Sequence, residues 1–445
     1  MHKAMTTFFM LGYSVACSGQ SELLHKYLEI QHQRINFNGV VLVAKNNQPL
    51  YQVSIGKASQ ELDIPMSIGT VFKIASISKQ FTAMLVVLAT QEGLFRLDDS
   101  LAMFFPKLKS VQWRKMTLDQ LLSHTSGIPH NEGIADYWIL KSRLPLSKEQ
   151  ALAEIFAMKL LFEPGTDMKY SSPGYFLLAC ILETAYRRPY SAIFEEKILH
   201  PLGMKHSGVF VTGKVIPGMV PAYHLLNDSL IGAPHRDFSL MKGSGDLYSN
   251  AEDLAKWNSS FSTNGIWGDS LQKLLFTIHT QKTPYYGYGW FIRPGKRPAY
   301  YHGGGTFGCS ALLAWYPDEQ ISIIILSNIS TLPINELWND IEKITFKEPF
   351  ELPVIHTTVQ ISTAELQAFT GLYMQEHQEL NILFVNDKLY AKLGTNPPFE
   401  IYPEKRFQFY GKKVNVHFIF NADVEGNITG LEAEVGGRKH YFHKK

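Results

Sequence analysis

Several features are scarce in this 445-residue sequence, and each scarcity excludes a class of protein. Its 3 cysteines are too few for a framework of disulfide bonds. The sequence has no His-Glu-x-x-His or Cys-x-x-Cys motif, so we predict neither a metal site nor a cofactor. The formal net charge of +2 gives no reason to expect nucleic acid or an anionic membrane as a partner. After the N-terminus, no apolar run approaches the ~20 residues that span a bilayer.

Length and composition indicate a soluble globular protein with two or three domains. Hydrophobic residues make up 45% of the chain and charged residues 18%, which is ordinary for a protein with a sizeable core. The sequence shows no internal repeats and no low-complexity tracts.

The first twenty residues have the pattern of a signal peptide. Lys3 precedes a short apolar run, and Ser14-Val15-Ala16 puts small residues at the two positions that a signal peptidase reads. We therefore expect residues 1–20 to be a signal peptide and the protein to be exported, to the periplasm or the extracellular space. A lipid anchor on Cys17 is the alternative, although Ser14 stands where a bulky aliphatic residue usually precedes a lipidated cysteine.

The order of the predicted elements indicates an α/β fold in the broad sense (α+β). One alternating hairpin is predicted over residues 38–57, with a turn at Asn46-Asn47, and another over 311–326. The patterns between them are mainly helical, and one of these helices opens with a capping box at Ser147. We expect the two hairpins to share one antiparallel sheet, flanked by helices and joined to a helical lobe. This domain, residues 21–347, ends at a linker, and the alternating pattern of residues 354–445 predicts a small antiparallel β domain.

Residues 72–92 predict the helix around which the larger domain is built. Apolar residues recur there at three- and four-residue steps, and Gly93 follows where a C-terminal cap belongs. Ser76 stands at the start of this helix, and Lys79 lies one turn later on the same face, so the amine can meet the hydroxyl. Burial and the positive end of the helix both disfavour an ammonium, which would let Lys79 act as the base that activates Ser76.

Ser-x-x-Lys alone is a weak signal, because the motif occurs repeatedly in this sequence. The other occurrences lie in a strand-like segment, beside a glycine loop and on a short helix: Ser54/Lys57, Ser239/Lys242 and Ser270/Lys273. Only Ser76 opens a long apolar helix, which makes it the preferred nucleophile.

Tyr170 is the first candidate partner of Ser76. It lies in a turn-rich loop immediately before a helix, where its hydroxyl could enter a cleft between the lobes. A phenol near an ammonium has its pKa lowered and can relay a proton. The alternative is an ordinary packing tyrosine. Tyr248 competes in a second Tyr-x-Asn match, but there Asn250 is expected to cap a helix.

The second candidate is the glycine run that follows His302. Three glycines at the start of a strand let a ligand approach the backbone closely and pair with the sheet edge, and one N–H group there could stabilise an oxyanion. A structural histidine is the alternative reading of His302. Cys180 and Cys309 are expected to be buried small hydrophobic residues, and a nucleophilic Cys309 is a remote alternative.

With these sites assembled, the chain resembles the serine β-lactamase and penicillin-binding protein superfamily. It is most similar to class C β-lactamases, D,D-carboxypeptidases and the related esterases and D-aminopeptidases, over roughly residues 30–345. The resemblance is carried by seven blocks in the family's order: ASISKQFTA (75–83), LDDSL (97–101), LLSHTSGIP (121–129), PGTDMKYSSPGY (164–175), PLGM (201–204), GDLYSNAEDLA (245–255) and HGGGTFG (302–308).

The resemblance implies a role for each candidate residue. Ser76 would be the acylated nucleophile, Lys79 its base partner and Tyr170 the proton relay. The backbone N–H groups of Ser76 and Gly305 would form the oxyanion hole. The full catalytic set it implies is Ser76, Lys79, Tyr170 and His302, and the substrate-binding set is Ser172, Gly303, Gly304 and Thr306.

Two departures from the family pattern bear on the substrate. Ser172 replaces the usual Asn of Tyr-x-Asn, and His302 replaces the Lys of class C lactamases, which removes a permanent cation. Both favour a peptidase or esterase over a strong β-lactamase. We therefore expect an exported serine hydrolase that acts on an ester, amide or peptide, such as a cell-wall peptide or a β-lactam. The alternative is a non-catalytic protein of the same fold that binds cell-wall peptide or penicillin.

Overall fold

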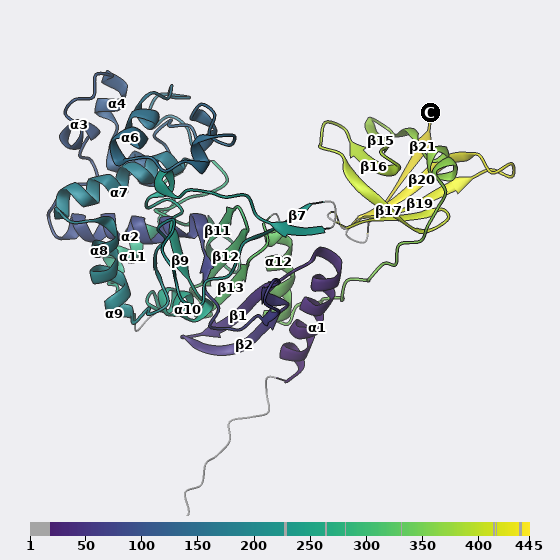
Figure 1. Ribbon diagram of the computed structural model, residues 1–445, viewed down its shortest axis with the longest axis horizontal. Coiled ribbons are helices and arrows are strands. Elements are labelled where there is room, and N and C mark those ends of the chain that lie inside the picture. Colours follow the sequence, from purple (N-terminus) through teal and green to yellow (C-terminus); the bar gives the residue numbers. More distant parts are fainter. Residues whose placement is uncertain are drawn as a thin grey trace, which may run out of the picture. The chain divides into compact units, whose positions relative to one another are not determined.

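The structure is a computed structural model that describes residues 18–445 except 227–228, 263–264, 281, 331, 413, 415 and 436–437. It divides into two compact units (Figure 1). Besides residues up to Leu28, the first unit contains Phe37–Phe350, and the second contains Glu29–Asn36 and Glu351–Lys445. Of the predicted signal peptide, residues 1–17 lie outside the described residues, and Cys17 with them. None of the described helices has the length and hydrophobicity that a bilayer crossing requires.

The first unit is built on a six-stranded antiparallel sheet with the strand order β10-β11-β12-β13-β1-β2. Its strands are β1 (Gly39–Lys45), β2 (Gln48–Ile55), β10 (Phe291–Arg293), β11 (Ala299–Thr306), β12 (Cys309–Tyr316) and β13 (Ile321–Ser327). β1 pairs with β13, so the two predicted hairpins do share one sheet. Asn46 and Asn47 turn the first hairpin with φ of 49° and 61°, a turn that matches the twist of the strands.

Helices surround this sheet, and short strands lie outside it. The helices are α1 (Ser18–Ile35), α2 (Ser78–Gln91), α3 (Leu101–Phe104), α4 (Val111–Lys115), α5 (Leu118–Leu122), α6 (Lys148–Phe156), α7 (Ser172–Tyr186), α8 (Tyr190–Phe194), α9 (His200–Leu202), α10 (Ala251–Ser259), α11 (Asp269–Phe276), α12 (Ile334–Thr345) and, in the second unit, α13 (Thr363–Ala368). The short strands are β3 (Lys57–Ser59), β4 (Ile64–Pro65), β5 (Phe72–Lys73), β6 (Gly208–Val209), β7 (Tyr223–Leu226), β8 (Ser229–Gly232) and β9 (Leu247–Ser249).

Successive side chains along the strands point to opposite faces of the sheet, and both faces are buried. On β12, Leu313 and Trp315 join a large core that includes residues of α2, α7 and α10. Tyr316 points to the other face, where its hydroxyl accepts a 2.8 Å hydrogen bond from Trp338 of α12. Since both faces are covered, β12 and β13 are buried along their whole length, and their residues are mostly apolar rather than alternating with polar ones.

The helix ends follow the capping signals in the sequence. Thr117 and Ser147 each form a complete capping box at the start of α5 and α6, as predicted for Ser147. The Asn250 side chain accepts a 2.8 Å hydrogen bond from the backbone N–H of Asp253 and so caps α10. α2 ends at Gln91, and Gly93 follows two residues later with φ of 75°, the left-handed conformation expected of a C-terminal cap.

The second unit is a closed barrel of antiparallel strands with its own core. Its strands are β14 (Gly371–Gln375), β15 (Gln378–Val385), β16 (Lys388–Leu393), β17 (Phe399–Lys405), β18 (Gln408–Gly411), β19 (Val416–Ala422), β20 (Ile428–Val435) and β21 (Arg438–Lys444). β21 returns to pair with β14, which closes the barrel and leaves no free sheet edge. The small antiparallel β domain predicted from the alternating pattern is therefore confirmed.

Candidate active site

Ser76 lies on a strained turn immediately before α2. The turn is a 3₁₀ helix, Ala75–Ile77, and Ala75 has φ of 45°, a conformation that costs a non-glycine residue about 1–3 kcal/mol. Ser78 holds the turn, because its hydroxyl donates to Ala75 O (2.6 Å) and accepts from Leu247 N (3.1 Å). Ser76 is thereby kept half-buried in the wall of a cavity instead of being wound into the helix.

Lys79 is fully buried on the first turn of α2. Its Nζ has three neighbours within hydrogen-bond reach: Ser76 Oγ at 3.2 Å, Ser172 Oγ at 3.0 Å and the backbone oxygen of Ser244 at 2.7 Å. Burial lowers the pKa of Lys79 well below its usual value, and the charge of Arg236 lowers it further. The structure thus brings together the amine and the hydroxyl that the sequence paired.

No other Ser-x-x-Lys pair has this arrangement in the described part of the chain. Lys242, for example, donates to Glu183 Oε1 at 2.8 Å and not to Ser239. The hydrogen bond between Lys79 and Ser76 therefore separates one occurrence of the motif from the rest.

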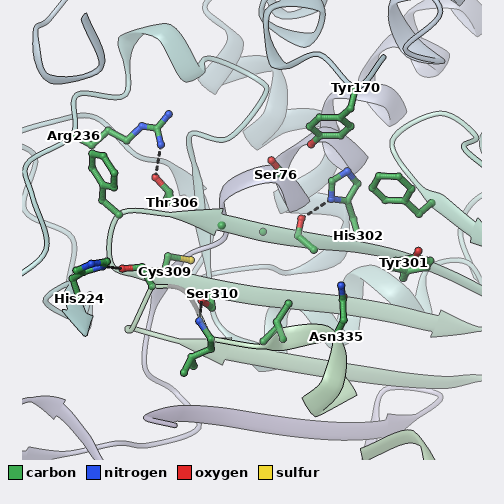
Figure 2. A pocket seen from close by; sticks show the side chains of 18 of the residues that line it. Ser76, Tyr170, His224, Arg236, Tyr301, His302, Thr306, Cys309, Ser310 and Asn335 are labelled. Carbon is green, nitrogen blue, oxygen red and sulfur yellow. Dashed lines mark hydrogen bonds between the residues drawn. The ribbon is translucent and has the colours of Figure 1, made fainter. Parts of the chain in front are cut away.

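Tyr170 precedes α7 and lies over Lys79. The Lys79 Nζ is 4.8 Å from the centroid of the tyrosine ring. In Figure 2 the phenol oxygen is directed toward Ser76. That oxygen is buried and makes no hydrogen bond of normal geometry with any described residue. The hydroxyl, the amine and the phenol therefore converge, as the sequence predicted.

We predicted that the pKa of Tyr170 would be lowered, and the direction of this shift was wrong. Burial raises the pKa of Tyr170 well above its usual value, and the nearby Ser76 hydroxyl offsets only part of this effect. We expected the Lys79 ammonium to lower it, but a lysine whose own pKa is depressed supplies little positive charge. Tyr170 is accordingly a neutral phenol, suited to relaying a proton rather than removing one.

His302 lies on β11, and both of its ring nitrogens have protein partners. Nδ1 lies 2.6 Å from the Gly303 carbonyl oxygen and must donate, so Nε2 accepts from the Tyr286 hydroxyl at 3.2 Å. Burial lowers the pKa of His302 to about 3. The ring is therefore uncharged near neutral pH. This geometry fits a residue that fixes β11, and the catalytic role of His302 stays a prediction.

The glycine run lets β11 pass close to the turn that carries Ser76. A Cβ on Gly304 would lie only 2.2 Å from the Ile74 carbonyl oxygen, so this position excludes any side chain. Gly303, Gly304 and Thr306, which we predicted to bind substrate, line the cavity, and so does Gly305, the predicted oxyanion donor. The oxyanion hole of Ser76 and Gly305 remains a prediction that this close approach favours.

Ser172 is placed differently from our expectation. It is fully buried at the start of α7 and does not line the cavity, because its short side chain turns toward Lys79. Its backbone N–H donates to His130 Nδ1 at 3.0 Å, which holds this end of the helix in place. In this geometry Ser172 is a hydrogen-bond partner of the lysine, and a direct substrate contact has no support.

A buried layer of aromatic rings around Tyr170 was not predicted. The His124 ring packs at a tilt against Tyr170 and Tyr286, with centroid distances of 4.4 and 4.6 Å, and its Nδ1 accepts from Ser171 N at 3.2 Å. Burial lowers the pKa of His124 well below the ordinary value, so the ring stays neutral. The block LLSHTSGIP contains this histidine, but nothing in the sequence indicates that it would support Tyr170.

The cavity has a volume of about 730 Å³, which is ample for a small substrate. Figure 2 shows β11 crossing it, with Ser76 above the strand. Cys309 also lines it, but its Sγ donates to the Lys73 carbonyl oxygen at 2.6 Å. Burial raises the pKa of Cys309 to about 12, which disfavours the thiolate that a nucleophile would need.

In the barrel, three residues whose side chains could bind a metal ion lie close together, and they are the one such cluster among the described residues. His356 Nδ1 and His417 Nε2 lie 2.9 and 3.0 Å from the two carboxylate oxygens of Glu404. These three residues come from the linker, β19 and β17, so no short motif marks them. As they stand, they form a hydrogen-bonded cluster that ties the linker segment to the barrel.

Known proteins share sequence with most of this chain. A family model described as Beta-lactamase matches residues 28–341. Penicillin-binding protein 4* of Bacillus subtilis (strain 168) is 25% identical over 451 residues, covering 95% of this chain and 98% of that protein.

Two solved structures share the fold. The octameric penicillin-binding protein homologue from Pyrococcus abyssi has a TM-score of 0.68 at 22% identity and covers 95% of this chain and 99% of its own. The D-amino acid amidase from Ochrobactrum anthropi SV3, complexed with D-phenylalanine, has a TM-score of 0.64 at 21% identity and covers 74% of this chain and 99% of its own. Because the first of these spans nearly the whole chain, the likeness extends through the barrel.

Proposed function

Because this chain belongs to the β-lactamase family, we propose that it is a serine hydrolase that forms an acyl-enzyme on Ser76. The observation that carries the proposal is the hydrogen bond of 3.2 Å between Ser76 Oγ and the fully buried amine of Lys79. A serine hydroxyl needs such a base to become a nucleophile.

The neighbours of Lys79 match a neutral amine. The Ser244 carbonyl oxygen can only accept, so it takes one N–H of Lys79, and Ser172 Oγ can take the second. A neutral amine then has its lone pair left for the Ser76 proton. The depressed pKa of Lys79 supports the same protonation state. Lys79 therefore serves as the general base for acylation.

Tyr170 completes the proton path in this proposal. Its ring lies over the Lys79 amine and its oxygen is directed toward Ser76, so a proton taken by Lys79 can pass to the leaving group through the phenol. The carbonyl oxygen of the substrate would accept from the N–H groups of Ser76 and Gly305. Each such donor is typically worth roughly 3–4 kcal/mol of the barrier.

The substrate class is an ester, an amide or a peptide. The relatives named as penicillin-binding proteins favour a cell-wall peptide or a β-lactam, and the amidase bound to D-phenylalanine favours a D-amino acid amide. Export to the periplasm or the extracellular space belongs to the same proposal, since the N-terminal sequence resembles a signal peptide.

The test measures turnover of a β-lactam, a p-nitrophenyl ester and a D-phenylalanine amide by wild type and two variants. Ser76→Ala should abolish hydrolysis of every substrate that wild type cleaves. Ser270→Ala, taken from another Ser-x-x-Lys motif, is the matched control and should keep wild-type rates. If Ser76→Ala hydrolysed these substrates at the wild-type rate, Ser76 could not be the nucleophile. Binding of these compounds without turnover or acylation by wild type would instead establish the non-catalytic alternative.

A further inference from the structure

Arg236 is a buried cation in the cavity wall that no step of the proposed mechanism uses. The residue is only 7% exposed and lies in the segment between β8 and the 3₁₀ turn Ser239–Met241. Three aromatic rings surround its guanidinium, each with its centroid 5.6 Å from Cζ: Tyr137, Trp138 and Phe307. Figure 2 shows the side chain reaching toward Thr306.

All hydrogen bonds of Arg236 are to neutral groups. Nη1 donates to Thr306 Oγ1 at 2.9 Å, while Nη2 donates to the Tyr137 hydroxyl and, at 3.2 Å, to the Met241 sulfur. Nε is buried and has no partner, and within the described ranges no Asp or Glu forms an ion pair with this guanidinium. An uncompensated buried charge is strongly destabilising, so this arrangement favours the arrival of an anion.

The cavity itself offers no counter-ion. Its described lining includes Arg236 and two histidines, His224 and His302, but neither Asp nor Glu. A low-dielectric pocket with charge of one sign concentrates ligands of the opposite sign. His302 does not provide the permanent cation that a lysine would provide at its position. Arg236, from another segment, brings such a cation into the cavity.

The position of Arg236 along β11 determines which part of a substrate it can reach. Its partner Thr306 ends β11, four positions after His302, or roughly 13 Å at the usual rise per residue. The rings of Tyr170 and His302 lie together, with centroids 5.8 Å apart. In Figure 2, Arg236 is at the opposite end of the strand, with Ser76 between. In the proposed mechanism the leaving group takes its proton from the side of Tyr170, so the acyl group would extend the other way, toward Thr306 and Arg236.

We propose that Arg236 and Thr306 form a carboxylate-binding subsite for the acyl portion of the substrate. This inference rests on the proposed function, and it narrows the substrate to an ester, amide or peptide whose acyl portion carries an anionic group. A guanidinium with a hydroxyl beside it provides charge-assisted donors for the two oxygens of a carboxylate. The three aromatic rings exclude water from one side of the guanidinium, which strengthens these interactions.

The test compares two esters that differ in the charge of the acyl group, mono-p-nitrophenyl adipate and its methyl ester. The measured quantity is the ratio of their kcat/KM values, after subtraction of spontaneous hydrolysis. Wild type should favour the anionic ester by about ten- to a hundred-fold. Arg236→Gln should reduce this ratio to near unity, and Arg236→Lys should restore part of it. Arg96→Gln, which removes an exposed arginine paired with Asp98, should leave the ratio unchanged.

Each outcome of this test decides the inference. If wild type gives a kcat/KM ratio of anionic to neutral ester at or below unity, the subsite is overturned, even if Arg236→Gln does not fold. The subsite is also overturned if a folded Arg236→Gln keeps the wild-type preference for the anionic ester. In either case hydrolysis of the neutral ester at Ser76 leaves the proposed function standing. If neither ester acylates Ser76, the proposed function fails and the subsite fails with it.

Discussion

Two basic side chains in this unit, Lys79 and Arg236, are buried without an acidic hydrogen-bond partner in the described residues. Folding alone does not favour such positions, because the desolvation of each basic group is not balanced by an ion pair. The strained φ of Ala75 beside Ser76 adds a further cost. These costs gather around one cavity, which is the pattern of a site selected for chemistry rather than for stability.

The first residue-scale prediction concerns Lys79 and pH. The folded pKa of Lys79 is depressed by burial, so between that pKa and about 10.5 the unfolded chain binds a proton that the folded protein does not. Wild type must then lose stability, relative to Lys79→Met, by about 1.4 kcal/mol for each unit that the pH falls in this window. Urea unfolding at several pH values measures the difference. Parallel profiles for the two proteins would contradict a neutral Lys79.

The second residue-scale prediction concerns the Tyr170 hydroxyl. Tyr170→Phe should lower kcat by about 10²- to 10⁴-fold, because the relay of the proton is lost. It should not lower the melting temperature, since the buried hydroxyl makes no hydrogen bond of normal geometry with any described residue. Tyr248→Phe, the competing match in the sequence, is the control and should keep wild-type kcat. A Tyr170→Phe enzyme of normal rate would remove the phenol from the mechanism.

At the residue scale, the reacting groups could be predicted from the sequence, but their pKa values and the charges around them could not. Ser76, Lys79 and Tyr170 could be found because each has a local pattern, a helix start or a loop before a helix. The raised pKa of Tyr170 and the position of Arg236 depend on burial by segments far away in the chain. The spacing of residues along the sequence does not predict burial by such distant segments.

At the scale of elements, β11 and the Ser76 turn must pack without a side chain between them. Gly304→Ala would place a methyl group 2.2 Å from Ile74 O, so the turn has to shift. We expect a loss of about 1–3 kcal/mol in unfolding free energy together with most of the activity. Gly303→Ala is the matched control, because the nearest atom to its added methyl group is 3.8 Å away. Equal effects of the two substitutions on the free energy of unfolding, measured by urea unfolding, would refute this explanation.

Elements with local signals were predicted best. The capping box at Ser147 and the Asn46-Asn47 hairpin turn depend on neighbours in the sequence, and both are present. Helix lengths were less accurate: the helix expected from residue 72 becomes a short strand, a 3₁₀ turn and then α2 from Ser78. The glycine run was placed at the start of a strand but lies at the end of β11, because pairing with β12 decides where that strand begins.

At the scale of the whole molecule, the two units have separate cores. Calorimetry should therefore resolve two unfolding transitions, each sensitive to substitutions in its own unit. Gly304→Ala is expected to lower only the transition of the first unit.

Glu404→Gln should lower only the transition of the barrel. Burial raises the pKa of Glu404, but hydrogen bonds from His356 and His417 outweigh this and hold it below the usual value. The carboxylate therefore stabilises the barrel above the ordinary glutamate pKa, by about 1 kcal/mol, and this stabilisation disappears as the pH falls through the lower folded pKa. The difference between wild type and Glu404→Gln should shrink on acidification below about pH 4.3. A difference that grows instead would contradict the role given to the carboxylate.

The central claim is that a substrate becomes covalently attached to Ser76. The most direct measurement is peptide mapping by mass spectrometry after acid quench of the protein with penicillin or an activated ester. The account predicts the added acyl mass on the peptide that contains Ser76 and no addition to the Ser76→Ala protein. Acyl mass on any other residue, or equal labelling of the Ser76→Ala protein, would contradict it.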